Sequence, residues 1–417
     1  MRAWELRQGD CVELMRALPE NSIDAIVTDP PYGLSPDGKA RTWDDIEDGK
    51  ARGGFMGKGW DAAVPGVTWA RECYRVLKPG GAIVAFGGQR TIHRLTVSLE
   101  DGGFQIRELF GWLNWQGFPK SLDASKALDA HHGAEREVVG RKTYAGGHIQ
   151  NSTEAGRAMV PGGSGMRAAV DSRTVTAPAT EDARTWEGFG TALKPCLEPA
   201  IIARKPLIGT VAENLLEWGT GALNIDGCRY AYGDDAWPGP QEGYGRSPLR
   251  ANGTRSTRRT ADEWGMSSGG GEHAHALGRW PANVYATPKA SRSEREAGCE
   301  GLAPKRREDV TGREEGSAGQ QRARSGMTRT GDIRNHHNTV KPVRLMRWLC
   351  VLVGCQPGSL ILDPFAGSGT TGIAALRAGF RFLGMEREPE YVEIARARIR
   401  GDSPLFNQER SVLDASP

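Results

Sequence analysis

Two short apolar runs near opposite ends of this 417-residue chain each lead directly into an Asp-Pro sequence. The first run, 23–28, precedes Asp29-Pro30-Pro31-Tyr32, and the second, 359–362, precedes Asp363-Pro364-Phe365-Ala366-Gly367-Ser368-Gly369-Thr370. A compact apolar run that ends in turn residues is typical of a buried strand. Open α/β sheets place their ligand-binding loops at the carboxyl ends of such strands. The pair therefore predicts an α/β protein with two functional loops.

The second loop has the sequence context of a ligand-binding loop, because it follows a strand and opens a helix expected at 370–378. Gly367 and Gly369 let the backbone approach a ligand closely. The free amides of the helix N-terminus can bind a carboxylate. Glu386, at the end of the next expected strand, can accept hydrogen bonds from two ribose hydroxyls. A P-loop would need Gly-Lys-Ser/Thr, and a dinucleotide fingerprint would need GxGxxG, so both of these alternatives fail.

The first loop suits chemistry on an aromatic amine, whose nitrogen is a poor nucleophile because its lone pair is delocalised into the ring. Asp29 can accept one amino hydrogen and the Pro30 carbonyl can accept the other, which orients the nitrogen and increases its nucleophilic character. The two prolines stiffen the loop, and Tyr32 can stack on a base taken out of a duplex. Alone, the tetrapeptide is equally consistent with a Pro-rich turn around a buried Tyr.

Together the two loops resemble those of the amino-directed DNA methyltransferases, which act on adenine N6 or cytosine N4. The order resembles the circularly permuted beta class, in which the catalytic loop comes first. Asn338-Thr339-Val340-Lys341-Pro342 precedes the helix before the cofactor strand, as in that class. Further segments resemble methyltransferases common in phages and prophages: Phe55-Met56-Gly57-Lys58-Gly59-Trp60-Asp61, Lys78-Pro79-Gly80-Gly81, Phe118-Pro119-Lys120-Ser121 and Gly278-Arg279-Trp280-Pro281-Ala282-Asn283.

The resemblance implies a doubly wound, Rossmann-like methyltransferase sheet that is circularly permuted and carries an inserted target-recognition region. A strand at 105–115 is expected at the sheet edge, and 78–81 is expected to be a turn. The Gly-, Ser- and Arg-rich texture from about 120 to 335 marks the inserted region. We expect 1–120 to be the catalytic half, 121–335 the recognition region with mobile loops and some sheet-edge elements near 190–230, 336–400 the cofactor-binding half and 401–417 a tail.

The implied activity is site-specific methyl transfer from S-adenosyl-L-methionine to adenine N6 of a base flipped out of double-stranded DNA. Asp at position 29 favours adenine, because cytosine-N4 enzymes more often carry Ser there. Cytosine N4 is the alternative. The resemblance implies catalytic roles for Asp29, Pro30, Pro31 and Tyr32. It implies cofactor contacts for Asp10, Cys11, Asp29, Lys341, Asp363, Phe365, Ala366, Gly367, Ser368, Gly369, Thr370 and Glu386. A helix N-cap is a nearly equal interpretation of Asp10.

Other classes of protein remain open. Related Pro-Pro-Tyr loops serve methyltransferases that act on RNA or on protein glutamine, although those usually place the cofactor loop first. A non-catalytic DNA-binding protein with the same fold would not need an intact Asp29 and Glu386. Cys196 follows a Pro, as does the nucleophile of cytosine-C5 enzymes, but no Glu-Asn-Val follows it here. We therefore interpret Cys196 as an ordinary cysteine.

Bulk composition limits the partners. The net charge is only +3, so a DNA-binding surface must be local. The seven cysteines lack metal-ligand spacing, which indicates reduced thiols and no metal site. The sequence shows neither a signal peptide nor an apolar run long enough for a bilayer. We expect a cytoplasmic, nucleoid-associated protein with double-stranded DNA as partner and no nuclease or membrane partner. A homodimer is implied by the resemblance alone.

Overall fold

The computed structural model describes residues 2–33, 40–46, 61–117, 121–141, 174–239, 277–306, 333–402 and 407–409. The chain forms two compact units, and the smaller one comprises Gly117–Pro195. The larger unit comprises Met1–Gln116 and Cys196–Pro417. Two segments that the sequence singled out lie wholly or mostly outside the described residues, namely 55–60 and 118–120. None of the described helices combines the length and apolar character needed to cross a membrane.

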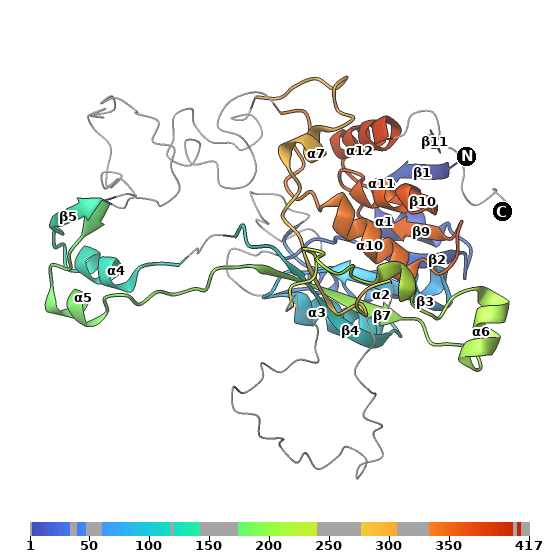
Figure 1. Ribbon diagram of the computed structural model, residues 1–417, viewed down its shortest axis with the longest axis horizontal. Coiled ribbons are helices and arrows are strands. Elements are labelled where there is room, and N and C mark those ends of the chain that lie inside the picture. The colour runs from blue at the N-terminus through green and yellow to red at the C-terminus, as the bar shows by residue number, and fades with distance from the viewer. Residues whose placement is uncertain are drawn as a thin grey trace, which may run out of the picture. The chain divides into compact units, whose positions relative to one another are not determined.

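One large sheet forms the core of the larger unit (Figure 1). Its described strands are β1 (Arg2–Gln8), β2 (Ile23–Thr28), β3 (Leu77–Phe86), β4 (Gln105–Leu113), β7 (Leu197–Arg204), β8 (Val284–Ala286), β9 (Leu360–Asp363), β10 (Arg381–Glu386) and β11 (Asn407–Glu409). Among the described residues the strand order is β11-β1-β10-β9-β2-β3-β7-β4-β8. The pairs from β11 to β3 are parallel, and β7 runs antiparallel to both β3 and β4.

Helices cover both faces of the sheet. The described α-helices of the larger unit are α1 (Cys11–Arg16), α2 (Val67–Val76), α3 (Ile92–Asp101), α6 (Val211–Trp218), α7 (Arg292–Glu296), α10 (Val343–Val353), α11 (Thr370–Arg377) and α12 (Pro389–Asp402). All six residues of β2 are buried, and its side chains alternate between two hydrophobic clusters. Val27 packs in the cluster that includes Leu349 of α10, whereas Ile26 packs in the cluster that includes Met15 of α1. Side chains of a strand alternate between faces, so this is the predicted doubly wound α/β fold.

The direction of strand succession reverses between β2 and β9. From β2 the chain proceeds through α2 to β3, while from β9 it proceeds through α11 to β10 on the opposite side. Neighbouring parallel strands with crossovers in opposite directions leave an opening at their carboxyl ends, where ligands bind in open α/β sheets. The loops after Thr28 and after Asp363 both leave the sheet at this point, although 335 residues separate these two side chains in sequence.

Two local expectations about the sheet are wrong. The strand predicted at 105–115 is β4, but it lies one position inside the edge, because β8 pairs with it in parallel. The turn predicted at 78–81 lies within β3, where the register with β2 shifts between Ile23 and Ala25. Asn214 Nδ2 and Thr220 Oγ1 both donate to the Pro79 carbonyl. The Pro-Gly-Gly sequence therefore forms an irregular bulge, which tertiary hydrogen bonds stabilise.

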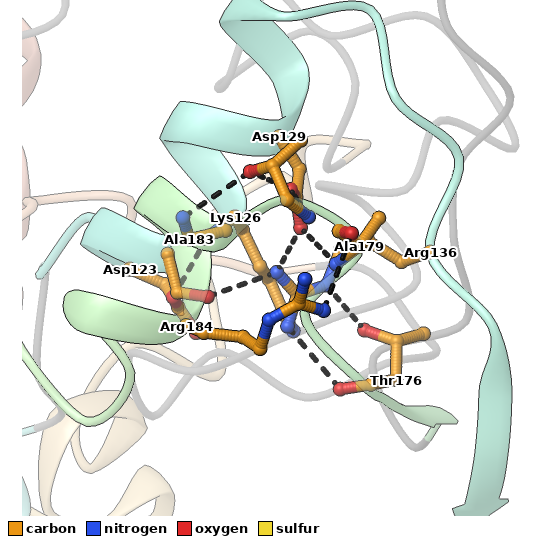
Figure 2. A network of polar contacts seen from close by, with 10 residues as sticks. Asp123, Lys126, Asp129, Arg136, Thr176, Ala179, Ala183 and Arg184 are labelled. Carbon is orange, nitrogen blue, oxygen red and sulfur yellow. Dashed lines mark hydrogen bonds and ion pairs between the residues drawn. The ribbon is translucent and has the colours of Figure 1, made fainter.

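The smaller unit contains α4 (Ala124–His131), β5 (Val138–Arg141), β6 (Thr174–Thr176) and α5 (Glu181–Thr185). Its described part is organised around one buried carboxylate, Asp129, shown in Figure 2. Asp129 accepts hydrogen bonds from the Arg136 guanidinium, the Ala179 amide and both the amide and the hydroxyl of Thr180. Burial raises the pKa of Asp129, but these donors outweigh burial and lower that pKa to about 2.

Candidate functional site

A buried hydrogen bond joins the starts of the two loops. The Thr28 hydroxyl, on the last residue of β2, donates to Asp363 Oδ1 at 2.6 Å. The Thr371 hydroxyl donates to Asp363 Oδ2, also at 2.6 Å, and the Phe365 amide donates to Oδ1. Burial raises the pKa of Asp363 to about 6 although these donors oppose it. Both oxygens of Asp363 therefore join the two loops, and its predicted contact with the cofactor stays a prediction.

The loop after β2 is held at its far end by Asp61. Asp61 is 5% exposed and its Oδ1 accepts from the Tyr32 amide at 2.8 Å and from the Gly33 amide at 3.3 Å. The Thr91 hydroxyl donates to the Tyr32 carbonyl at 2.6 Å. Gly33 has a φ of +64°, a conformation that favours glycine. These contacts and the two prolines define one conformation for residues 29–33.

Asp29 has two oxygens in different environments. Lys341 Nζ lies 2.5 Å from Asp29 Oδ2. Asp29 Oδ1 is buried and has no hydrogen-bond partner among the described residues. Burial raises the pKa of Asp29, and the Lys341 ammonium partly opposes this. A buried acceptor without a donor is costly, so Oδ1 is suited to a donor that arrives with a ligand.

The Lys341 ammonium contacts two residues of the loop after β2, Asp29 and Tyr32. Its side chain is 7% exposed, and it also donates to the Tyr32 hydroxyl at 3.0 Å. Its Nζ lies 4.9 Å from the ring centre of Phe86, 5.3 Å from that of Tyr32 and 5.8 Å from that of Trp112. In this structure the Lys341 ammonium forms hydrogen bonds with Asp29 and Tyr32, and its expected contact with the cofactor stays a prediction.

The loop after β9 forms a turn closed by Glu386. The Gly367 amide donates to Glu386 Oε2 at 2.9 Å, and the Glu388 amide donates to Oε1 at 2.8 Å. Burial raises the pKa of Glu386. The Gly9 amide donates to the Glu386 carbonyl at 2.9 Å, which places the start of α1 beside the end of β10. Gly9, Gly367 and Glu386 thus meet at the carboxyl ends of the neighbouring strands β1, β9 and β10.

The predicted cofactor residues divide by what their side chains contact. Asp10 caps α1, because its Oδ1 accepts from the Val12 and Glu13 amides. Cys11 is buried, and burial raises the pKa of its thiol. Phe365 packs against Trp43 and Trp69, with ring centres 5.6 and 5.8 Å apart.

The next residues of the cofactor loop face the protein. The buried Arg398 guanidinium donates to the carbonyl and hydroxyl of Ser368 and to the hydroxyl of Thr370. These two side chains therefore stabilise the loop from behind. Ala366 is 5% exposed, and its amide donates to the Met385 carbonyl. Gly367 and Gly369 have φ of +51° and +76°, and a Cβ there would lie 2.8 Å from His337 Nε2 and 3.0 Å from Ala395 Cα, respectively, so both positions are restricted to glycine.

Two residues of the site, Glu198 and His337, were not among the predicted site residues. Glu198 of β7 has its Oε2 3.6 Å from Lys341 Nζ, and its Oε1 accepts from Lys289 at 2.8 Å. Its position depends on the pairing of β7 with β3 and β4, which no local pattern reveals. His337 lies against the cofactor loop, since a Cβ on Gly367 would be 2.8 Å from its Nε2. Burial lowers the pKa of His337 to about 3, so the ring is neutral near pH 7.

A family comparison agrees with this geometry. Residues 23–152 and 227–397 match the model of a family described as DNA methylase, whose name refers to N6 and N4 methyltransferases. These ranges cover more than half of the chain and include both loops. The protein therefore belongs to the DNA methylase family, and DNA is its substrate.

The chain is also similar in sequence to individual methyltransferases. The chain is 22% identical to the type II methyltransferase M.HindIII of Haemophilus influenzae over 96% of its own length and 97% of the relative. It is 46% identical to the type II methyltransferase M2.DpnII of Streptococcus pneumoniae over 16% of the chain and 25% of that relative.

Two solved structures are also similar. The PvuII DNA methyltransferase, described as cytosine-N4-specific, is 15% identical to this chain, with a TM-score of 0.43. The match covers 95% of this chain and 86% of the PvuII enzyme. The M1.HpyAVI protein, in its complex with S-adenosylmethionine, is 15% identical to this chain, with a TM-score of 0.38. The match covers 95% of this chain and 98% of M1.HpyAVI.

Proposed function

We propose that this DNA methylase transfers a methyl group from S-adenosylmethionine to N6 of an adenine flipped out of double-stranded DNA. The observation that carries the proposal is the buried, unpartnered Asp29 Oδ1 within the described structure. Asp29 lies at the carboxyl end of β2, beside the loop after β9. An amino hydrogen of a base supplies the donor that Oδ1 lacks.

The chain's residues act on the amine by orientation. Asp29 Oδ1 accepts one amino hydrogen and the Pro30 carbonyl accepts the second, which directs the nitrogen lone pair out of the base plane. The Tyr32 ring provides a stacking surface for a base outside the helix. As the new C–N bond forms, the bond between the methyl carbon and the cofactor sulfur breaks and S-adenosylhomocysteine is released. The amine loses one proton, and Asp29 Oδ1 is the acceptor in contact with it. No covalent bond to the protein is formed.

The cofactor fits the loop after β9. Glu386 is a carboxylate at the end of β10 that can accept from ribose hydroxyls. Gly367 and Gly369 adopt left-handed backbone conformations that favour glycine, and the Gly367 amide is hydrogen-bonded to Glu386, so the turn lies beside this carboxylate. Asp10 uses only Oδ1 as the cap of α1, next to Gly9. When bound, S-adenosylmethionine supplies an electrophilic methyl group on sulfur. We propose that Gly9–Cys11, 363–370 and Glu386 form its pocket.

The choice of adenine rests on Asp29 itself. The class resemblance associates Asp at this position with adenine and Ser more often with cytosine. M.HindIII, a type II methyltransferase, matches nearly the whole chain. Both bases present an amine beside a ring nitrogen, so Asp29 Oδ1 and the Pro30 carbonyl can hold either of them. The product therefore decides the assignment.

A product analysis tests the proposal. DNA would be incubated with the purified protein and S-adenosylmethionine, digested to nucleosides and separated by mass spectrometry. We expect N6-methyladenine, and none when Asp29→Ala replaces the natural protein. N4-methylcytosine as the sole product would overturn the choice of base but retain the role of Asp29. Equal methylation by both proteins would overturn the site.

A further inference from the structure

We propose that Glu198 is a positioning residue of the target-base pocket, which acts on Asp29 through the Lys341 ammonium. This inference rests on the proposed function, in which Asp29 accepts an amino hydrogen from the base. Glu198 lies on β7, directly opposite Trp112 of β4 in the antiparallel register. In the sheet, β3 lies between β7 and β2, so Glu198 and Asp29 come from strands on opposite sides of β3. Its carboxylate and that of Asp29 both lie within 4 Å of the same ammonium.

Glu198 is itself held from the other side. Its Oε1 accepts from Lys289 Nζ at 2.8 Å and from Asn114 Nδ2 at 3.3 Å, which leaves Oε2 facing Lys341. The side chain is 21% exposed, so its interaction with the almost fully buried Lys341 is only partly screened by solvent. Both partners of Oε1 are contributed by segments beyond β4 and β8, which fix Glu198 independently of Asp29.

Lys341 has three hydrogens to donate, and the structure shows three oxygens around it. Asp29 Oδ2 and the Tyr32 hydroxyl are hydrogen-bonded to it, and Glu198 Oε2 is an ion-pair partner at 3.6 Å. Among the described residues, the rings of Phe86, Tyr32 and Trp112 also lie near the ammonium. A buried ammonium needs paired charges. Because Glu198 shares the ammonium with Asp29, Lys341 is held beside Oδ2 and Oδ1 stays available for the base.

The arrangement gives Lys341 and Glu198 opposite effects on Asp29. The charged and titratable groups that face Asp29 are Lys341, Glu198, Tyr32 and, across the β2–β9 junction, Asp363. Burial raises the pKa of Asp29, Lys341 lowers it, and Glu198 raises it. Loss of the Lys341 charge therefore raises the pKa of Asp29 further. Loss of the Glu198 charge lowers it while releasing one contact of Lys341.

The test is the pH dependence of single-turnover methylation. Lys341→Met should move the acid limb of the rate profile to higher pH, because Asp29 must be ionised to accept the amine. Glu198→Gln should move that limb to lower pH and reduce the plateau rate roughly 10- to 100-fold, because the ammonium is less well positioned. Lys341→Arg and Glu198→Asp keep the charges and should retain the natural acid limb.

Cofactor affinity provides a readout that does not depend on activity. Calorimetric titration with S-adenosylhomocysteine should give the same affinity for Glu198→Gln as for the natural protein, which also shows that the variant is folded. Glu217→Gln, an exposed carboxylate on α6, is the control and should change neither quantity.

Two outcomes separate this inference from the proposed function. If the natural protein and Asp29→Ala methylate equally, the proposed function fails. If Asp29→Ala is inactive but Glu198→Gln and Lys341→Met move the acid limb in the same direction, or not at all, the positioning role of Glu198 is overturned. A fall in cofactor affinity in Glu198→Gln would also overturn it, because Glu198 would then act on the cofactor side.

Discussion

Asp29 and Asp363 begin chemically similar Asp-Pro loops, yet the two carboxylates differ in their contacts. Both oxygens of Asp363 accept hydrogen bonds from Thr28, Thr371 and Phe365. Only one oxygen of Asp29 has a partner among the described residues. Each carboxylate oxygen can accept more than one hydrogen bond, but a buried oxygen with no donor at all is costly and is suited to a donor from a ligand. This difference assigns the reacting amine to Asp29.

We expect Asp29→Ala to reduce methyl transfer at least 100-fold while cofactor affinity stays within about twofold, since removing one preorganised group at the reacting atom typically costs 10²–10³ in rate. Tritiated-methyl incorporation measures the first quantity and calorimetric titration the second. Exposed Glu217→Gln serves as the control. A variant that retains near-normal turnover would contradict the orienting role.

Glu386→Ala should weaken S-adenosylhomocysteine binding by about 1.5–3 kcal/mol, because a charged acceptor for hydroxyl donors is lost. The Gly367 amide also loses its partner. Glu386→Gln keeps an acceptor and should bind with intermediate affinity. Calorimetry measures all three proteins. Unchanged affinity in both variants would place the cofactor elsewhere.

At the scale of elements, the loop between β9 and α11 depends on backbone conformations that favour glycine. Gly367 has a φ of +51°, and a Cβ there would also meet His337. Gly358 has a φ of +83° but nothing within 4 Å of an added Cβ. Substitution of Gly358 therefore tests backbone strain alone, whereas substitution of Gly367 tests strain together with steric crowding.

We expect Gly358→Ala to lower the free energy of unfolding by about 1–2 kcal/mol, since a non-glycine residue is strained at positive φ. Gly367→Ala should lower it further, because its methyl group would also lie 2.8 Å from His337 Nε2. Only Gly367→Ala should also weaken S-adenosylhomocysteine binding, because its methyl group enters the ligand loop. Thermal unfolding and calorimetry measure the two effects. Equal affinities in both variants would remove Gly367 from the pocket.

At the scale of the molecule, the smaller unit has its own electrostatic centre in Asp129 (Figure 2). Its pKa is lowered to about 2, whereas an unfolded Asp has a pKa of about 3.9. The sign is that of a depressed acid: the stabilisation is fully present above about pH 4 and is lost as the pH falls through about 2.

We expect Asp129→Asn to increase amide hydrogen exchange in 121–141 and 174–195 at pH 7, without affecting β2 and β9. Exposed Asp182→Asn should change exchange in 121–141 and 174–195 far less. Hydrogen exchange read by mass spectrometry on the full chain gives both regions at once. Identical exchange in the natural protein and Asp129→Asn would show that the unit does not depend on this carboxylate.

Sequence recognition also belongs to the whole molecule. The assignment of 121–335 as the recognition region stays a prediction, and the structure shows that this range contains β7 and β8 of the sheet. Replacing only 117–195 with the counterpart from a related enzyme preserves the sheet. We expect the methylated sequence to change with this unit, as measured by methylation-aware sequencing. Retention of the original sequence would place recognition elsewhere.

The sequence alone determined the two loops, because their information is local. Buried apolar runs predict β2 and β9, and Gly and Pro after them predict the sharp turns at Asp29 and Gly367. Charge and residue type at Asp29, Tyr32 and Glu386 predict the chemistry without reference to any distant partner. These features depend on the steric preferences of neighbouring residues and on the local pattern of apolar residues, both of which the sequence shows directly.

Only the tertiary structure decided which distant residues complete the site. The sequence around Lys341 does not distinguish a cofactor contact from an Asp29 contact. Glu198 lies in β7, which the sequence predicted only as one of the sheet-edge elements near 190–230. Their meeting requires β7 to insert antiparallel between β3 and β4, a pairing set by burial and hydrogen bonding across more than a hundred residues. Desolvation there also sets the raised pKa of Asp29, because burial is a property of the folded chain.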